Sequence, residues 1–327
     1  MKSFLRILAA AIIGGSVAVP MIAQTAKQPA KSWRTPWGDP DLQGSWSNAT
    51  TTPLQRPAKY GNREFLSLEE RAQQDKETSI GTDRRTQAGT PDDVNGAYNQ
   101  FWWERGWSDG RTSLIYDPPD GRIPPLTPEA QKRIASQPRP IPLEARADVL
   151  DKAGYKGPED VELYTRCIVR AALPRVPTGY DNNYQIVQSP GFVAITQEQI
   201  HETRVIPLDG RPHLDAGVGQ WLGDSRGHWE GDTLVVETTN FSGQVSFEGA
   251  TKDMRLVERW TRLADDRVDY RFMVSDPATW TKPWSAAITW TKTGPLYEYA
   301  CHEDNYGLYG ILAGARAKEH AAANVAK

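Results

Sequence analysis

The 327-residue chain has little of what several classes of protein require. It contains two cysteines, five histidines and no long block of basic residues, and its formal net charge is −3. A nucleic-acid-binding protein needs a basic patch or stripe, which is missing here. The glycine patterns that cradle nucleotide phosphates, G-x-G-x-x-G and G-x-x-x-x-G-K, are missing as well. We therefore expect no nucleic-acid partner and no organic cofactor, and we do not expect a nucleophilic serine.

Long apolar runs are also scarce, and the one that exists lies at the amino terminus. Lys2 and Arg6 form a short basic head before residues 7–15, ILAAAIIGG. This pattern predicts a secretory signal peptide, and the run falls short of the roughly 20 apolar residues that a membrane-spanning helix needs. We place the signal peptide and its cleavage region at 1–26. We expect a periplasmic or secreted protein with no stable membrane anchor after cleavage; a retained amino-terminal anchor is the alternative.

The two cysteines, Cys167 and Cys301, form an even pair in a chain predicted to be exported. In an oxidising compartment such a pair usually forms a disulfide, and this one would close a long loop; two buried free thiols are the alternative. Neither cysteine has histidines at zinc-site spacing. The H-x-H and H-E-x-x-H patterns do not occur either, so we expect no metal.

The later part of the chain alternates apolar and polar residues in short runs that are separated by turn residues. These runs cover 184–188, 192–196, 201–206, 233–238, 256–261, 268–274, 284–290 and 296–300. Such a series is typical of an antiparallel meander. A meander of seven or more strands protects its edges by closing on itself. The pattern therefore predicts a mainly β fold, with an antiparallel meander closing into a barrel over 166–310.

Residues 27–165 differ, because proline and glycine interrupt them too often for long regular elements. Two short helices are predicted, one at 67–72 with a capping box between Ser67 and Glu70, and one at 127–134 with Thr127 as cap and Pro128 in the first turn. A third is predicted at 311–320. We predict one domain over 27–327, in which the loop-rich 27–165 wraps the barrel core.

Gly44-Ser45-Trp46 resembles the G-x-W start of lipocalin-like barrels. The chain also resembles a family of exported bacterial proteins without an assigned function. The stretches that carry this second resemblance are 35–44 (TPWGDPDLQG), 118–127 (PPDGRIPPLT), 221–227 (WLGDSRG) and 299–303 (YACHE). The first resemblance implies a lipocalin-like barrel, and the second supplies no list of catalytic residues and so does not decide the function.

Three of the five histidines are expected to be solvated, since His213 and His228 lie in predicted turns and His320 lies in a polar tail. His201 is a better candidate, because it lies in a run that reads as a strand. Alternation places His201 and Thr203 on one face of that strand and Arg204 on the other. An imidazole facing the barrel interior would serve as a general base near neutral pH; a core histidine bonded to the backbone is the alternative.

His302 directly follows Cys301, so a disulfide would fix its position. Tyr299 and Glu303 lie close by in the sequence and add groups that can donate or accept a proton. A polar strand end at the barrel mouth would explain the same composition. We predict catalytic roles for His201 or His302 as the base, for Glu303 or Tyr299 as the acid, and for Arg204 in orienting an anionic group.

Tryptophan is abundant, with twelve in the chain, and three of them fall within residues 101–107. An indole can stack on a sugar ring or an apolar ligand. We therefore predict substrate binding by Trp102, Trp103, Trp107 and Trp221, although anchoring of the loop-rich part to the barrel explains the cluster equally well.

Together these observations predict an exported enzyme of small-molecule or carbohydrate breakdown, acting without a cofactor by acid–base hydrolysis or elimination. The alternative is a lipocalin-like periplasmic protein that binds an apolar ligand inside the barrel. A polar cluster around His201 and His302 would favour the enzyme, and an interior lined only by apolar side chains would favour the binding protein.

Overall fold

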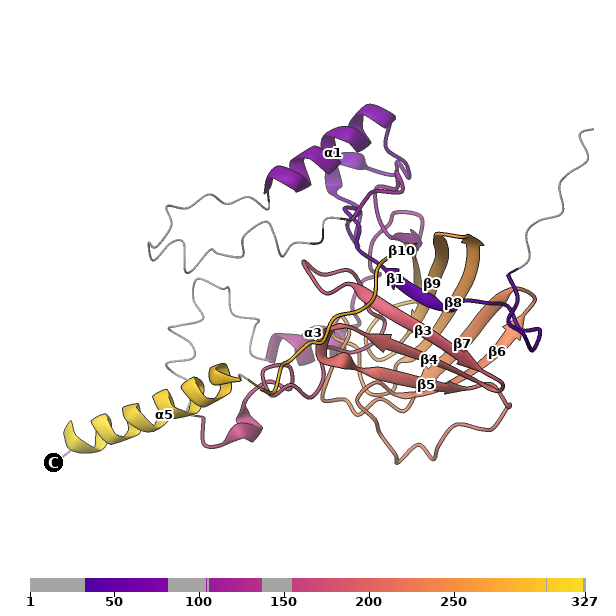
Figure 1. The fold of residues 1–327 in the computed structure, drawn as a ribbon. Coiled ribbons are helices and arrows are strands. Elements are labelled where there is room, and N and C mark those ends of the chain that lie inside the picture. Colours follow the sequence, from indigo (N-terminus) through magenta and orange to yellow (C-terminus); the bar gives the residue numbers. More distant parts are fainter. Residues whose placement is uncertain (1–32, 82–103, 105, 137–154, 304, 326–327) are drawn as a thin grey trace, which may run out of the picture. The chain divides into compact units, whose positions relative to one another are not determined.

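The computed structural model describes residues 33–81, 104, 106–136, 155–303 and 305–325 (Figure 1). The predicted signal peptide, Trp102 and Trp103 lie outside these residues. Three α-helices occur in the described part: α1 (Leu68–Gly81), α3 (Pro128–Ser136) and α5 (Tyr306–Val325). None of the helices found there combines the length and the apolar character needed to cross a membrane.

Ten strands form one antiparallel sheet, as the alternation predicts. They are β1 (Gly44–Ser47), β2 (Ile115–Asp117), β3 (Asn183–Ser189), β4 (Phe192–Gln197), β5 (Thr203–Pro207), β6 (Asp224–Glu230), β7 (Thr233–Thr239), β8 (Arg255–Ala264), β9 (Arg267–Ser275) and β10 (Trp284–Lys292). Three of the hairpins, β3–β4, β6–β7 and β8–β9, have two-residue turns, and two of these turns contain a glycine at positive φ, Gly191 and Gly231.

The strand order explains how the sheet closes. Nine strands follow the order β5-β4-β3-β1-β10-β9-β8-β7-β6, and β2 pairs with β10 outside this path. The sheet thus consists of two meanders, β3–β5 and β6–β10, which the short β1 joins through antiparallel ladders on both of its sides. Figure 1 shows β3, β4 and β5 side by side.

The two end strands, β5 and β6, lie against each other and nearly close the barrel. Because seven strands lie between β5 and β6 and each neighbouring pair is antiparallel, the two end strands run in the same direction. Among the described residues no ladder of hydrogen bonds joins them; we call this junction the seam. At Gly227 an added Cβ would lie 2.7 Å from Leu208 and 2.9 Å from Ile206, so the glycine permits the close approach of the two strands.

The inward face of the sheet is filled by large aromatic side chains. Trp46, Trp260, Trp284, Tyr270 and Phe272 are all at most 1% exposed. Their rings pack in stacked, tilted and edge-to-face pairs, for example Trp260 on Tyr270 with ring centroids 5.0 Å apart. Each such side chain buries about 150–250 Å², so the aromatic residues supply a large part of the core beside Leu, Ile and Val side chains.

The helix predictions are confirmed at their amino-terminal caps. Ser67 accepts a hydrogen bond from the Glu70 N–H, and the Glu70 carboxylate accepts one from the Ser67 N–H, which is the predicted capping box. Thr127 caps α3 through the N–H of Ala130 at 3.1 Å. The carboxyl-terminal helix is longer than predicted and spans α5.

Other sequence predictions were wrong. Residues 296–300 are not a strand, whereas β1, β2 and β6 were not foreseen. His201 belongs to a 3-10 turn, η5 (Gln199–His201), and β5 begins only at Thr203. Within β5 the buried residues are Arg204 and Ile206, so the face that looks into the barrel is the one opposite to Thr203 and Val205.

Candidate functional site

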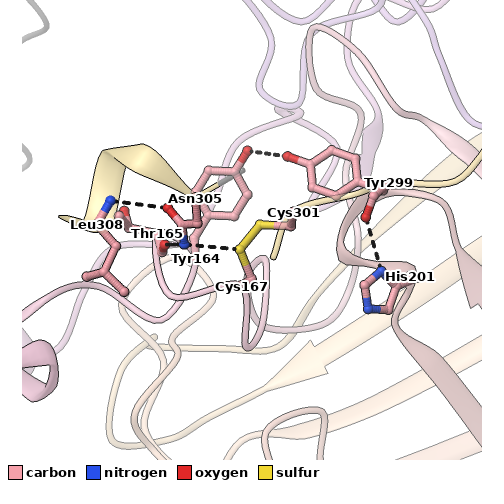
Figure 2. The surroundings of a disulfide bond; sticks show 8 residues. All are labelled: Tyr164, Thr165, Cys167, His201, Tyr299, Cys301, Asn305 and Leu308. Atoms are coloured by element: carbon pink, nitrogen blue, oxygen red, sulfur yellow. Dashed lines mark hydrogen bonds between the residues drawn. A yellow bond between two sulfur atoms is a disulfide. The ribbon is translucent and has the colours of Figure 1, made fainter. Parts of the chain in front are cut away.

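His201 and His302, far apart in the sequence, lie together at the surface. Their ring centroids are 6.3 Å apart, and both residues are exposed. His201 Nδ1 lies 3.3 Å from the backbone oxygen of Tyr299 (Figure 2). Because a carbonyl oxygen only accepts, Nδ1 carries a proton in this contact, and the lone pair of the neutral ring is on Nε2. His201 therefore offers Nε2 as a base or as a ligand.

The segment that carries His302 is fastened at three points. Cys167 and Cys301 form the predicted disulfide, with a sequence separation of 134 residues and a Cα–Cα distance of 5.8 Å. The Tyr299 hydroxyl lies 3.0 Å from that of Tyr164, and Asn305 donates to the backbone oxygen of Thr165 at 2.7 Å. In Figure 2 the Tyr299 ring reaches toward Tyr164, so its backbone, and not its phenol, contacts His201.

The backbone that presents His201 is strained. Ile200 and His201 both have positive φ, 62° and 44°. For a β-branched residue this conformation is an outlier, and such residues persist only where the surroundings hold them, often at functional sites. The turn is held by hydrogen bonds from the His201 N–H to the Glu198 carbonyl at 3.0 Å and from the Gln197 N–H to the Glu202 carbonyl at 2.8 Å.

Three carboxylates lie near this turn: Glu104, Asp181 and Glu198 place one oxygen each within 4.8 Å of one another. Burial, together with the charges of the other two, raises the pKa of Asp181 to about 6. Hard cations favour such oxygen ligands. Glu198 already accepts hydrogen bonds from Asn183 and from the Tyr297 N–H, at 2.7 and 3.0 Å. These bonds offset the free-energy cost of burying its carboxylate without a cation. Glu303 is exposed and forms no part of this group.

Arg204 lies inside the barrel, whereas the two histidines are exposed. It forms a bidentate ion pair with Glu258, at 2.5 and 3.2 Å, and the Tyr270 hydroxyl donates to the same carboxylate at 2.9 Å. The Arg204 and Glu258 side chains are 9% and 1% exposed. Burial opposes the charge of Arg204, but the attraction of Glu258 outweighs it and raises the arginine pKa. Burial also raises the pKa of Tyr270.

A second buried ion pair, Arg175–Glu202, lies beside the first. Burial lowers the pKa of Arg175 to about 10, which still leaves the guanidinium charged at neutral pH. Both pairs line a cavity of about 30 Å³, together with Trp260 and Trp290. A cavity of that size holds a water molecule or two. The barrel interior is therefore nearly filled, with two buried ion pairs enclosed by apolar and aromatic side chains.

A larger hollow lies outside this core, at the seam. Its volume is about 600 Å³, within the range of small-molecule sites. We call it the seam groove. Its lining comprises Thr203, Arg204, Val205, Gly219, Gln220, Trp221, Leu222, Gly223, Asp224, Ser225, Ser242 and Gln244. Arg204 and Leu222 also line the interior cavity, so the two spaces adjoin.

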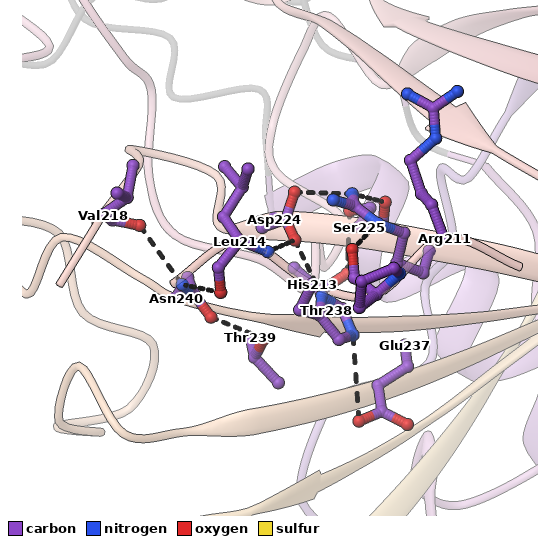
Figure 3. A network of polar contacts seen from close by, with 12 residues as sticks. Arg211, His213, Leu214, Val218, Asp224, Ser225, Glu237, Thr238, Thr239 and Asn240 are labelled. Atoms are coloured by element: carbon purple, nitrogen blue, oxygen red, sulfur yellow. Dashed lines mark hydrogen bonds and ion pairs between the residues drawn. The ribbon is translucent and has the colours of Figure 1, made fainter. Parts of the chain in front are cut away.

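The loop 208–223, which connects β5 to β6, forms one wall of the groove and is tied to the sheet (Figure 3). The Asn240 amide donates to three backbone oxygens of the loop, at 2.8 to 3.3 Å. The buried Asp224 carboxylate lies 2.8 Å from His213 Nδ1 and accepts a bond from the Leu214 N–H at 3.0 Å. Burial opposes ionisation of Asp224, but these bonds and that of Arg226 outweigh it and lower its pKa.

His213 was expected to be solvated in a turn, but it bridges two carboxylates. Its Nδ1 contacts Asp224, and its Nε2 lies 4.0 Å from Glu237. The sequence did not predict the His213–Asp224 contact, because nothing in it indicates that the loop folds back over β6. The imidazole ties the loop to β6 and β7.

The spacing G-x-S-x-G also occurs, at Gly223-Asp224-Ser225-Arg226-Gly227, although no nucleophilic serine was expected. In hydrolases this motif forms a sharp turn between a strand and a helix, which exposes the serine. Here Ser225 lies within strand β6, is 5% exposed and shares a hydrogen bond with Thr238 at 2.9 Å. The nucleophile geometry is absent from this part of the chain.

The structure does not bring together the two predicted binding residues that it describes, Trp107 and Trp221. Trp221, 37% exposed, lines the seam groove with Arg204. Trp107 lies elsewhere, against Arg71 of α1 with 5.4 Å between the guanidinium and the ring centroid.

Comparison with known proteins identifies no relative: no family model, no curated protein and no solved structure matches the chain.

Proposed function

We propose that the protein is an exported enzyme that breaks down a small molecule or a carbohydrate by acid–base hydrolysis or elimination. In this proposal His201 removes a proton from water or from the substrate, and His302 returns a proton to the leaving group. Tyr299 acts as a positioning residue through its backbone oxygen. The observation that carries the proposal is the pairing of two histidines, one of them with its tautomer set by the Tyr299 carbonyl.

The strained turn at Ile200 and His201 supports this role, since left-handed non-glycine residues gather at functional sites. The disulfide supports it too, because it fixes the segment that carries His302. The same disulfide and the signal-peptide pattern support export to an oxidising compartment.

The alternative, a lipocalin-like protein with an apolar ligand inside the barrel, has less support. Indole and phenol rings fill the interior, and the cavity among Trp260, Trp290 and Tyr270 measures about 30 Å³. The two buried ion pairs would also have to face an apolar ligand, which costs free energy.

The test starts with the oxidised protein and a thermal-shift panel of neutral sugars, uronates, aromatic glycosides, fatty acids and terpenoids. A ligand at 100 times its dissociation constant adds about 2.7 kcal/mol of stability. Mass spectrometry then shows whether a stabilising compound is converted. We expect conversion of a glycoside or sugar derivative, with His201→Asn and His302→Asn each lowering kcat by about 100-fold or more.

His228→Asn is the matched control, because His228 is exposed and pairs with Glu230 on β6. It should retain full activity, and all three variants should keep the wild-type melting temperature. Full activity in both His201→Asn and His302→Asn would refute the catalytic assignment. Stabilisation by fatty acids or terpenoids without conversion would favour the binding protein instead.

A further inference from the structure

We propose that the seam groove binds a neutral oligosaccharide, with Trp221 as the stacking platform. This inference goes beyond the proposed catalytic role, because binding in the groove requires neither His201 nor His302. It rests on the charge of the groove, on its mixture of aromatic and polar groups, and on the edges of the two strands that border it.

The charged side chains of the groove are already neutralised. Arg204 is held by Glu258, and Asp224 is paired with Arg226 at 2.6 Å and with His213 at 2.8 Å. The groove therefore offers no uncompensated charge to an anionic or cationic ligand. A ligand with its own charge would be desolvated there without a partner, which is costly.

The other lining groups suit a sugar. Trp221 is 37% exposed and Val205 is 58% exposed, so an apolar surface is open to solvent. Around them lie the neutral hydroxyls and amides of Thr203, Ser242, Gln220 and Gln244. A pyranose presents apolar C–H faces and a rim of hydroxyls, so its ring face can stack on the indole while the hydroxyls bond to the polar side chains.

The strands that border the groove add backbone groups. In the described part of the chain β5 pairs only with β4, and β6 pairs only with β7. The edges of β5 and β6 that face the seam therefore carry N–H and C=O groups that no ladder uses. Backbone groups of this kind need partners, and the hydroxyls of a sugar chain along the seam both donate and accept.

The wall that carries Trp221 is preorganised. The Gln220 N–H donates to the Asn240 carbonyl at 2.9 Å, and the Ser242 N–H donates to the Gln220 carbonyl at 2.8 Å. Gly223 has φ +70°, and an added Cβ would lie 2.5 Å from the Thr239 oxygen. These contacts fix the backbone on both sides of Trp221, so ligand binding carries little entropic cost for ordering this loop.

The test is isothermal titration of the full oxidised protein with neutral tetrasaccharides, namely cello-, xylo-, malto-, laminari- and N-acetylchito-tetraose, and with tetragalacturonate as the acidic counterpart. We expect at least one neutral tetrasaccharide to bind more tightly than tetragalacturonate. Trp221→Ala should weaken that binding about tenfold, which corresponds to the upper range of an aromatic stacking contact, and Trp221→Phe should weaken it less.

Trp37→Ala is the matched control, because Trp37 has the same 37% exposure but lies in the segment before β1. It should bind like the wild type, as should His201→Asn, which separates this proposal from the catalytic one. The proposal is overturned if no neutral tetrasaccharide binds at millimolar concentration, if tetragalacturonate binds best, or if Trp221→Ala binds as tightly as Trp37→Ala.

Discussion

Replacing Glu258 by glutamine tests the ion pair that crosses the barrel interior. Glutamine keeps the shape of the side chain but removes its charge, so the guanidinium of Arg204 stays buried without a counter-ion. Breaking a buried pair in this way costs about 3–5 kcal/mol. The Tyr270 hydroxyl, which donates to the same carboxylate, would also lose its charged acceptor. Such a loss is a large part of the 5–15 kcal/mol by which a typical domain is stable.

The assay is urea unfolding at pH 7 with the disulfide intact, followed by circular dichroism and extrapolated linearly to water. Asp232→Asn is the control, because the Arg34–Asp232 pair has the same 2.5 Å distance as Arg204–Glu258 but side chains 42% and 67% exposed. We expect a loss below about 1 kcal/mol there. Equal losses in Glu258→Gln and Asp232→Asn would refute the claim that the interior pair lies in a medium of low polarity.

Two further changes test the groove wall and the acidic group. Gly223→Ala should destabilise the protein by about 1–3 kcal/mol in urea, because a Cβ there meets the Thr239 oxygen at positive φ. Gly210→Ala, at φ +73° with open space around it, should cost no more than about 1 kcal/mol, and an equal cost would argue against the close packing of the wall. Asp181→Asn tests the link between protonation and stability. The pKa of Asp181 is raised to about 6 in the folded state, whereas the unfolded chain loses this proton near pH 4. The free energy of unfolding of the wild type therefore falls as the pH rises from 4 to 6. The asparagine variant should be about 1 kcal/mol more stable than wild type at pH 8, after allowance for solvent screening, and no more stable at pH 4; parallel pH curves would contradict this.

Local patterns were sufficient to predict most of the fold. Alternation and turn residues predicted the meander, because hairpins depend on residues close in the sequence. The helix caps at Ser67 and Thr127 were predicted for the same reason. The strand β1 was not predicted, since its partners Ile186 and Lys292 lie far along the chain and four residues carry little pattern of their own.

The polar interior was foreseeable in part. Glu258 lies between Leu256 and Trp260 on the buried face of β8, and Arg204 lies beside Ile206 on the buried face of β5. A charged residue at such a position on each of two strands indicates a buried pair. By contrast, the His201–His302 contact depends on a left-handed turn at Ile200, where the sequence has no glycine or asparagine to indicate such a turn, so only the three-dimensional structure reveals its geometry.

The position of β1 has a consequence for the order of assembly. This strand is among the first segments to be synthesised, yet one of its two neighbours is β10, which is made near the end. The two meanders can form from local hairpins, but one continuous wall exists only after residue 292 has been made. Pairing over such distances is slow to form. A polypeptide with this strand order therefore cannot complete its barrel wall while it is still being made.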